Sequence, residues 1–185
     1  MKISNYFSPI SLSLLILVGL ASCSSKSEKE IKVISQLEQK LYNDTVPLKD
    51  TALSAKVRKL YIQFADENLN DTLSGTYLFK AADLSVGLNE PNVAVQLLER
   101  IIVKFPNHPK VAQALFYQAF IYDTQLHLVE SAKEKYRAFA QKFPNDPMAP
   151  SANATLMQLE AGLSDEDLVR MFEHKSDSLA ALNQK

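Results

Sequence analysis

The chain has 185 residues, of which 46% are hydrophobic and 22% charged, and this balance is typical of one folded domain with a core. The formal net charge of −1 gives no broad electrostatic reason to bind nucleic acid, so we expect no nucleic-acid partner. With four glycines, no tryptophan and no alternating stretch of β-branched residues, the composition favours an all-α fold over a sheet.

Residues 1–22 have the pattern of an export signal. Lys2 is their only charge, residues 10–21 form a largely apolar run, and small residues stand at positions 21 and 22. Twelve residues at about 1.5 Å rise each are too few to cross a hydrocarbon layer about 30 Å thick. We therefore expect a signal peptide that is removed, not a transmembrane helix.

Cys23 is the only cysteine and follows this signal directly, so no internal disulfide is possible. Residues 20–23, Leu-Ala-Ser-Cys, resemble the lipobox of bacterial lipoproteins, in which the cysteine carries a diacylglycerol and the chain is cut just before it. The resemblance implies lipidation of Cys23 and a membrane anchor, and Ser24 after it implies the outer membrane. Residues 23–29 are then expected to be the lipidated cysteine and a short polar tether.

A hexapeptide occurs twice in the second half of the chain, 38 residues apart. Residues 104–109 read KFPNHP and residues 142–147 read KFPNDP. Proline cannot continue a helix, so Pro106 and Pro144 end one. We expect the next helix to be capped by Asn107 in the first copy and Asp146 in the second. Its first position is expected to hold Pro109 or Pro147, to which proline is suited.

The repeat extends beyond this turn, because apolar residues recur at helical spacing before it. Shifting the set 94, 97, 98, 101, 102 and 105 by 38 gives apolar residues at five of six positions, with Lys135 as the exception. Such a period predicts a solenoid of helix pairs over residues 30–174, with seven to eight helices. The expected units are 30–70, 71–108, 109–146 and a partial unit, 147–174. Its last helix would begin at Ser164 and cover the end with Leu168, Met171 and Phe172, before a loose tail at 175–185.

These units resemble tetratricopeptide repeats, in the longer-period form of BamD-like and YbgF-like envelope proteins. The small residues Ala81, Ala94, Ala119 and Ala132 stand where that family packs its helices closely, and Pro106 and Pro144 stand at its closing proline. The resemblance implies a right-handed solenoid of helical hairpins. The period of 38 instead of 34, and Leu84 at the position of Tyr122 and the family's usual tyrosine, are departures from the pattern.

The resemblance also implies that the first helix of each pair lines a concave groove for a partner peptide. Four aromatic residues lie between positions 116 and 122, more than one core stripe requires. The alternative, which stays open at this point, is that Phe116 and Phe120 only pack between units. The residues expected to face the groove are Leu78, Ala82, Ser85, Gln113, Phe116, Phe120 and Asp123.

No constellation of catalytic or ligating residues accompanies these repeats. The three histidines, His108, His127 and His174, are each isolated and expected on the surface, and the sequence has no glycine-rich phosphate loop. Residues 165–167 are acidic but read as a helix start. We expect no enzyme activity, no cofactor, no metal and no small-molecule substrate. Lys133, Lys135, Arg137 and Lys142 read as a solvated helix face, with contact to anionic lipid as the weaker alternative.

Four Asp-Thr or Asp-Ser pairs, each followed by an apolar residue, can be interpreted in two ways. They begin at Asp44, Asp50, Asp71 and Asp177. Such residues are ordinary helix caps, and the triplets also resemble acceptors for O-glycosylation of exported proteins in one group of Gram-negative bacteria.

The sequence as a whole predicts a non-catalytic lipoprotein adaptor that binds another envelope protein, anchored in the outer membrane and facing the periplasm. Two alternatives remain open. One is a BamD-like component of outer-membrane protein assembly, and the other is a surface lipoprotein that assists nutrient capture.

Overall fold

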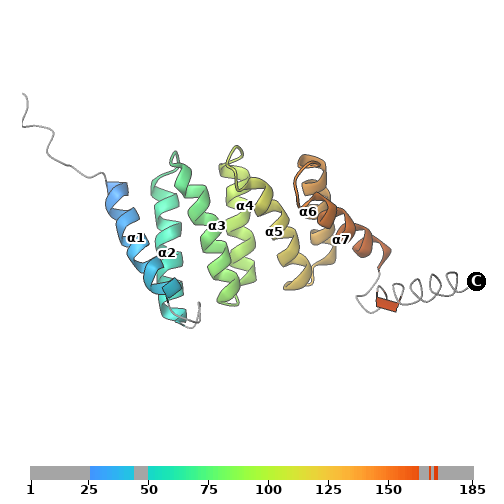
Figure 1. Cartoon of the computed structure of the whole chain (residues 1–185), viewed down its shortest axis with the longest axis horizontal. Coiled ribbons are helices and arrows are strands. Elements are labelled where there is room, and N and C mark those ends of the chain that lie inside the picture. The colour runs from blue at the N-terminus through green and yellow to red at the C-terminus, as the bar shows by residue number, and fades with distance from the viewer. Residues whose placement is uncertain (1–25, 44–49, 163–166, 168, 171–185) are drawn as a thin grey trace, which may run out of the picture.

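The computed structural model describes residues 26–43, 50–162, 167 and 169–170, and the helices in these ranges lie side by side in one row (Figure 1). α1 and α7 occupy opposite ends of the row. The described residues contain no strand, so the predicted all-α solenoid of helical hairpins is confirmed. The helices are α1 (Lys26–Asn43), α2 (Thr51–Glu67), α3 (Thr72–Gly87), α4 (Pro91–Lys104), α5 (Val111–Thr124), α6 (Val129–Lys142) and α7 (Ala149–Ala161).

The core runs along the row between consecutive helices. Small residues allow close approach, because Ala81, Ala94, Ala119 and Ala132 are all 0% exposed. Bulky side chains fill the space around them, and the predicted apolar faces of α4 and α6 point into this core, as does an apolar face of α2. The largest fully buried residues on these helices are Tyr61, Phe64, Leu98, Ile101, Tyr136 and Phe139.

Lys135, the exception in the repeated apolar set, is part of a polar chain across three helices. Its ammonium group lies 3.2 Å from a carboxylate oxygen of Glu99 on α4. Gln118 of α5, 1% exposed, donates to the same carboxylate at 2.9 Å and to the carbonyl of Val95 at 3.0 Å. Lys135 stands at the position equivalent to Leu97 in the preceding unit. The aliphatic part of its side chain can be half-buried there because its charge reaches a partner at the edge of the core.

The basic stretch on α6 pairs with neighbouring helices as well as with its own. Lys133 contacts Glu130 of α6 at 2.9 Å, as expected for a solvated face. Arg137, however, reaches Glu160 of α7 at 2.5 Å. Two of the four basic residues thus bridge helices, which sequence spacing alone did not indicate.

The repeated hexapeptide forms the turn between units, but its side chains bond within the turn and do not cap the next helix. Asp146 accepts a hydrogen bond from the backbone N–H of Met148 at 2.9 Å. The equivalent residue in the first copy is His108, whose Nδ1 accepts from the N–H of Lys110 at 3.1 Å. Lys110 and Met148 are the residues directly before α5 and α7, so the predicted caps at Asn107 and Asp146 are both wrong.

The two second prolines of the hexapeptide are also displaced from their expected place. α5 begins at Val111 and α7 at Ala149, so Pro109 and Pro147 lie two residues before the helices and not at their first position. The physical reason is that backbone hydrogen bonds form a turn before the helix begins. The N–H of His108 donates to the carbonyl of Phe105, and the N–H of Val111 donates to the carbonyl of His108.

His108 joins the first hexapeptide turn to the start of α3. Its Nε2–H donates to the carbonyl of Thr72 at 2.8 Å, and its ring lies so close to Gly75 that a Cβ there would be 2.7 Å from two ring atoms. His108 is half-buried, so the expectation of a free surface histidine is wrong for it, whereas His127 is exposed as expected. His174 lies outside the described residues.

The N-terminal helix starts earlier than the sequence indicated. Residues 23–29 were expected to form a tether, but α1 is helical from Lys26. Lys26 forms an ion pair with Glu67 of α2 and lies 3.7 Å from Glu30, one helical turn along α1. Glu30 also accepts from the side-chain amide of Asn68 at 3.4 Å. Lys26 of the expected tether thus has a partner on α2, and the helix extends to include it.

A buried tyrosine fixes α1 to the next two helices. The hydroxyl of Tyr61 on α2, 0% exposed, donates to Glu38 of α1 at 2.5 Å. Lys80 of α3 reaches the same carboxylate at 2.6 Å. Burial, followed by the bond to Glu38, raises the pKa of Tyr61 far above its usual range. The first hairpin is therefore part of the same solenoid.

Two of the Asp-Thr pairs are helix caps. Asp50 accepts from the N–H of Leu53 at 2.8 Å, and Asp71 accepts from the N–H of Leu73 at 2.8 Å. O-glycosylation at these pairs stays a prediction, and the pairs at Asp44 and Asp177 lie outside the described residues.

The expected last helix falls mostly outside the described part of the chain. Ser164, Leu168, Met171 and Phe172 are not described, while Asp167, Val169 and Arg170 are helical. Gly162 ends α7 in the left-handed conformation, with φ of 65°, as glycine commonly does after a helix.

The contact between Gly75 and His108 predicts an unusual response to substitution. Gly75→Ala should lower the free energy of unfolding by about 1–3 kcal/mol, because the new methyl group displaces the imidazole ring. In an open helix position the same change raises stability by about 1 kcal/mol. Urea denaturation measures the difference.

The control for this prediction is the same change in a His108→Ala background. There the methyl group meets no ring, so Gly75→Ala should be neutral or stabilising. Stabilisation by Gly75→Ala in the unmodified chain would contradict the proposed contact.

Candidate partner-binding face

One side of α5 remains accessible after the helices have packed. Its residues recur at intervals of three and four, so they lie on one helix face. Phe120 on this side is 41% exposed and is the one phenylalanine among the exposed large hydrophobic residues of the described chain. This side of α5 lies between α3 and α7, and together with the accessible residues of α3 we call it the α3–α5–α7 face. Its residues are Phe79 and Asp83 of α3 and Gln113, Phe116, Tyr117, Phe120, Asp123 and Thr124 of α5.

A first hollow of about 330 Å³ lies between α3 and α5. The rings of Phe79 and Tyr117 line it with centroids 5.9 Å apart, and the ammonium group of Lys110 lies 5.0 Å from the centroid of Phe79. Asp83 and Gln113 add polar groups. The hollow thus offers aromatic walls with a few hydrogen-bonding groups, a common composition for a binding groove.

A second hollow, of about 500 Å³, lies between α5 and α7. Phe120 lines it and is stacked on Tyr117, with ring centroids 6.4 Å apart. The two rings therefore form a ridge between the hollows. The other lining residues are Asp123, Thr124, His127, Tyr136, Thr155, Gln158 and Leu159.

Tyr117 is held on this ridge by Asp83. Its hydroxyl donates to the Asp83 carboxylate at 3.3 Å, across from α5 to α3. Burial, and then the negative charge and hydrogen bond of Asp83, raise the pKa of Tyr117 to about 12. The phenol is therefore protonated at neutral pH and serves as a donor that positions the ring.

Three residues expected on the groove are beneath the surface. Leu78, Ala82 and Ser85 of α3 are each 0% exposed, so they cannot present side chains to a partner. Ala82 and Ser85 occupy the positions equivalent to Phe120 and Asp123, but their side chains are too short to extend beyond their neighbours. The accessible residues of α3 are instead Phe79 and Asp83.

The expected residues of α5 divide between core and surface. Phe116 packs edge-on against Tyr136 and Phe139 of α6, with ring centroids at 5.7 and 5.4 Å. Phe116 therefore packs within its own unit, whereas the sequence suggested either a position facing the groove or packing between units. It also lines the first hollow. Gln113, Phe120 and Asp123 line the hollows.

Sequence reasoning did not identify Phe79, Asp83 or Tyr117 as members of this face. A signal for two of them was present, because positions 79 and 117 are one period of 38 apart and both are aromatic. Asp83 has no such signal, since its role comes from contact with a residue 34 positions away.

Two hairpins of the row match a known family model. Residues 76–108 and 113–146 match the model described as tetratricopeptide repeat, and they correspond to α3–α4 and α5–α6. These two hairpins are therefore similar to tetratricopeptide repeats. Such repeats typically bind protein partners, in keeping with an accessible face on their first helices. No curated protein matches the chain.

Two further observations concern only the described residues. None of their helices has the length and apolar character needed to span a bilayer. They also contain no cluster of three or more histidine, cysteine, aspartate or glutamate residues arranged to hold a metal ion.

The bond between Tyr117 and Asp83 predicts a measurable pKa change. Asp83→Asn should lower the pKa of Tyr117 from about 12 while leaving it above 10, because burial is the larger cause and persists. Tyr117 favours folding while it is protonated, and this contribution is fully present below pH 10 and is lost as pH rises through 12. NMR titration of ring-labelled tyrosine measures the pKa, with Tyr117→Phe to assign the signal. An unchanged pKa in Asp83→Asn would contradict the contact.

Proposed function

We propose that this chain is a lipid-anchored adaptor of the bacterial cell envelope that holds a partner protein on its α3–α5–α7 face. The observation that carries the proposal is the exposed ring of Phe120, at the ridge between two hollows on consecutive tetratricopeptide repeats. An exposed aromatic ring beside concave, partly apolar surface is the usual anchor point of a protein interface.

The geometry favours an extended segment or helix of the partner as the ligand. The two hollows are contiguous across the Tyr117–Phe120 ridge, so one segment can reach both. An apolar side chain of the partner would cover Phe120. Asp83, on the α3 side, offers a carboxylate to a basic or amide group.

The membrane part of the proposal rests on the sequence. The export signal and Cys23 lie outside the described residues, and the lipobox resemblance supports acylation of Cys23 and removal of residues 1–22. Ser24 supports the outer membrane, with the repeats facing the periplasm. A BamD-like role and a role in surface nutrient capture remain alternatives within this proposal.

Photo-crosslinking from position 120 tests the binding face. Benzoylphenylalanine in place of Phe120 should capture a discrete partner in living cells, since it keeps an aromatic ring at the ridge. The matched control is the same substitution at Val103 of α4, which is 60% exposed on a second helix. Identical adducts from both positions, or none from position 120, would refute the assignment of this face.

The same experiment separates the alternative roles. Capture of an outer-membrane assembly component would favour the BamD-like role. Proteinase added to intact cells should spare a periplasm-facing protein, whereas rapid digestion would favour the surface role.

Intact-mass measurement of the cell-derived protein tests the anchor. The expected mass is that of residues 23–185 plus a diacylglyceryl group and an N-linked acyl chain. Cys23→Ala should leave the signal uncut and the lipid absent. A Cys23 thiol that is unmodified in the membrane fraction would contradict lipidation. Mass added beyond the lipid would report glycosylation at the Asp-Thr pairs.

A further inference from the structure

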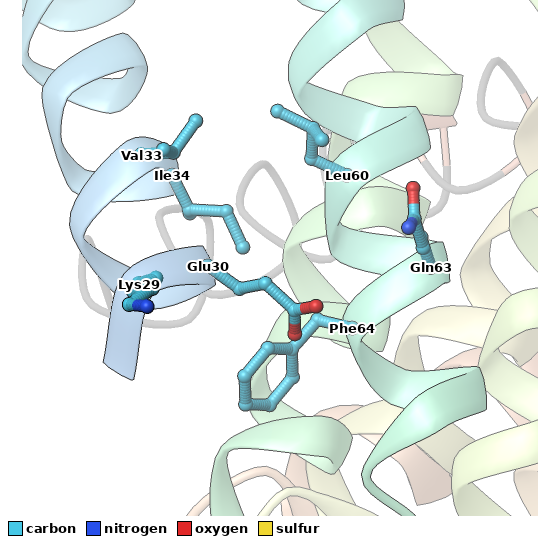
Figure 2. Close-up of a pocket in the computed structure, with 7 residues that line it drawn as sticks. All are labelled: Lys29, Glu30, Val33, Ile34, Leu60, Gln63 and Phe64. Atoms are coloured by element: carbon cyan, nitrogen blue, oxygen red, sulfur yellow. The ribbon is translucent and has the colours of Figure 1, made fainter. Parts of the chain in front are cut away.

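A groove lies between α1 and α2 at the N-terminal end of the row, away from the α3–α5–α7 face. Two adjoining hollows of about 150 and 530 Å³ share Val33 and Leu60 and together form this groove. Figure 2 shows the residues of the smaller hollow, with Glu30 and Ile34 of α1 and Phe64 of α2 extending toward the space between the two helices. We call this the α1–α2 groove.

The floor of the α1–α2 groove is apolar. Ile34 and Phe64, each 1% exposed, form its base, and Leu37 and Leu60 are half-buried along it. Val33 is 48% exposed at its edge. A valine exposed to this extent beside an apolar floor marks surface that favours contact with another apolar phase.

The rim of the groove is mainly basic, although the carboxylate of Glu30 also lines the smaller hollow. Lys29, Lys40 and Lys56 line it, and Lys32 and Lys59 are exposed on the same two helices. Among the described residues, these five lysines have no ion-pair partner within 4.0 Å. The carboxylates that could neutralise them are engaged elsewhere, in the pairs Glu30–Lys26, Glu67–Lys26, Glu38–Lys80 and Asp66–Arg100.

Only two further carboxylates belong to these helices and their caps within the described ranges. They are Glu28, exposed in the first turn of α1, and Asp50, which caps α2. Glu30 and Glu67 share the single charge of Lys26, so one negative charge remains there as well. Five lysines against these three negative charges leave an excess of two positive charges around an apolar groove. That combination is complementary to an anionic phospholipid surface, whose phosphates meet lysines and whose acyl boundary meets apolar side chains.

The position of the groove along the chain agrees with this partner. α1 begins at Lys26, three residues after Cys23. Three residues span at most about 11 Å, so a lipid on Cys23 would hold the start of α1 at the bilayer surface. α1 also forms one end of the row, opposite α7 (Figure 1).

We propose that the α1–α2 groove lies on the anionic phospholipid surface of the membrane. Lys29, Lys40 and Lys56 contact phosphate groups, and Val33 and Leu60 face the acyl boundary. The position of α1 at the bilayer rests on the proposed lipid anchor, whereas the lipid contact itself does not require it. The anchor and the groove together would fix the orientation of the row, with α7 at the end distant from the membrane.

Vesicle co-sedimentation tests the contact without the anchor. The protein is the chain from residue 23 onward with Cys23→Ser, so that it carries no acyl group. It should bind vesicles of phosphatidylcholine with 30% phosphatidylglycerol and should not bind pure phosphatidylcholine. The binding should weaken as salt is raised, because screening shortens the reach of the charges.

A matched pair of triple variants distinguishes the groove from diffuse charge. The variant Lys29→Gln, Lys40→Gln, Lys56→Gln should lose about a hundredfold in partition coefficient, since each lysine near an anionic surface contributes roughly fivefold. The control Lys104→Gln, Lys133→Gln, Lys142→Gln removes the same charge from α4 and α6 and should bind as the parent does. Circular dichroism checks that both variants are folded.

Three results would overturn the proposal: no binding to phosphatidylglycerol vesicles, undiminished binding of the groove variant, and equal loss in the control variant. The first would point to an acidic protein partner for the groove. Since the assay contains neither the lipid on Cys23 nor a partner for Phe120, its failure would leave both parts of the proposed function standing.

Discussion

Close contact at fully buried alanines is the constraint on which the rest of this structure depends. Ala81 and Ala94 in one unit, and Ala119 and Ala132 in the next, have no exposed surface. A methyl group at these places lets helices approach closely, so the larger side chains beside it meet the adjacent hairpin. No hairpin can bury its apolar face alone, and the row is stable only because each pair covers its neighbour.

A single row of this kind leaves two sorts of surface available. Along its side, the first helices expose whatever extends beyond the alanine layer, which on α5 is Phe120. At its N-terminal end, the described residues place no further helix over the α1–α2 groove, so an apolar floor and its basic rim stay accessible. A binding face and a membrane-facing end can therefore coexist without sharing residues.

The polar contacts of the row tie neighbouring units together at their edges. Tyr61 and Lys80 meet on Glu38, and Gln118 and Lys135 meet on Glu99. In both cases one carboxylate accepts from two partners on different helices, which satisfies donor groups that would otherwise be costly to bury. These contacts connect the first hairpin, which does not match the repeat family model, to the two hairpins that do.

Much of the fold was readable from the sequence because its signals are local. The 38-residue period, the apolar spacing and the proline turns predicted paired helices, and the structure confirms them. Predictions failed where a residue's role depends on a distant contact. His108 bonds to the N–H of Lys110 before α5 and rests on Gly75, 33 positions earlier, and α1 extends to Lys26 because Glu67 pairs with it.

The candidate site also has some features that the sequence predicted and others that depend on contacts between distant residues. The sequence by itself determined that α5 carries more aromatic residues than one core stripe requires, since that follows from counting residues on a helix. Only the tertiary structure decided that Phe116 packs on α6 while Phe120 stays exposed, and that Phe79 and Asp83 replace Leu78 and Ala82 at the surface. The reason is physical: helical periodicity fixes which residues share a face, but the size and rotation of neighbouring helices determine how much of that face they cover.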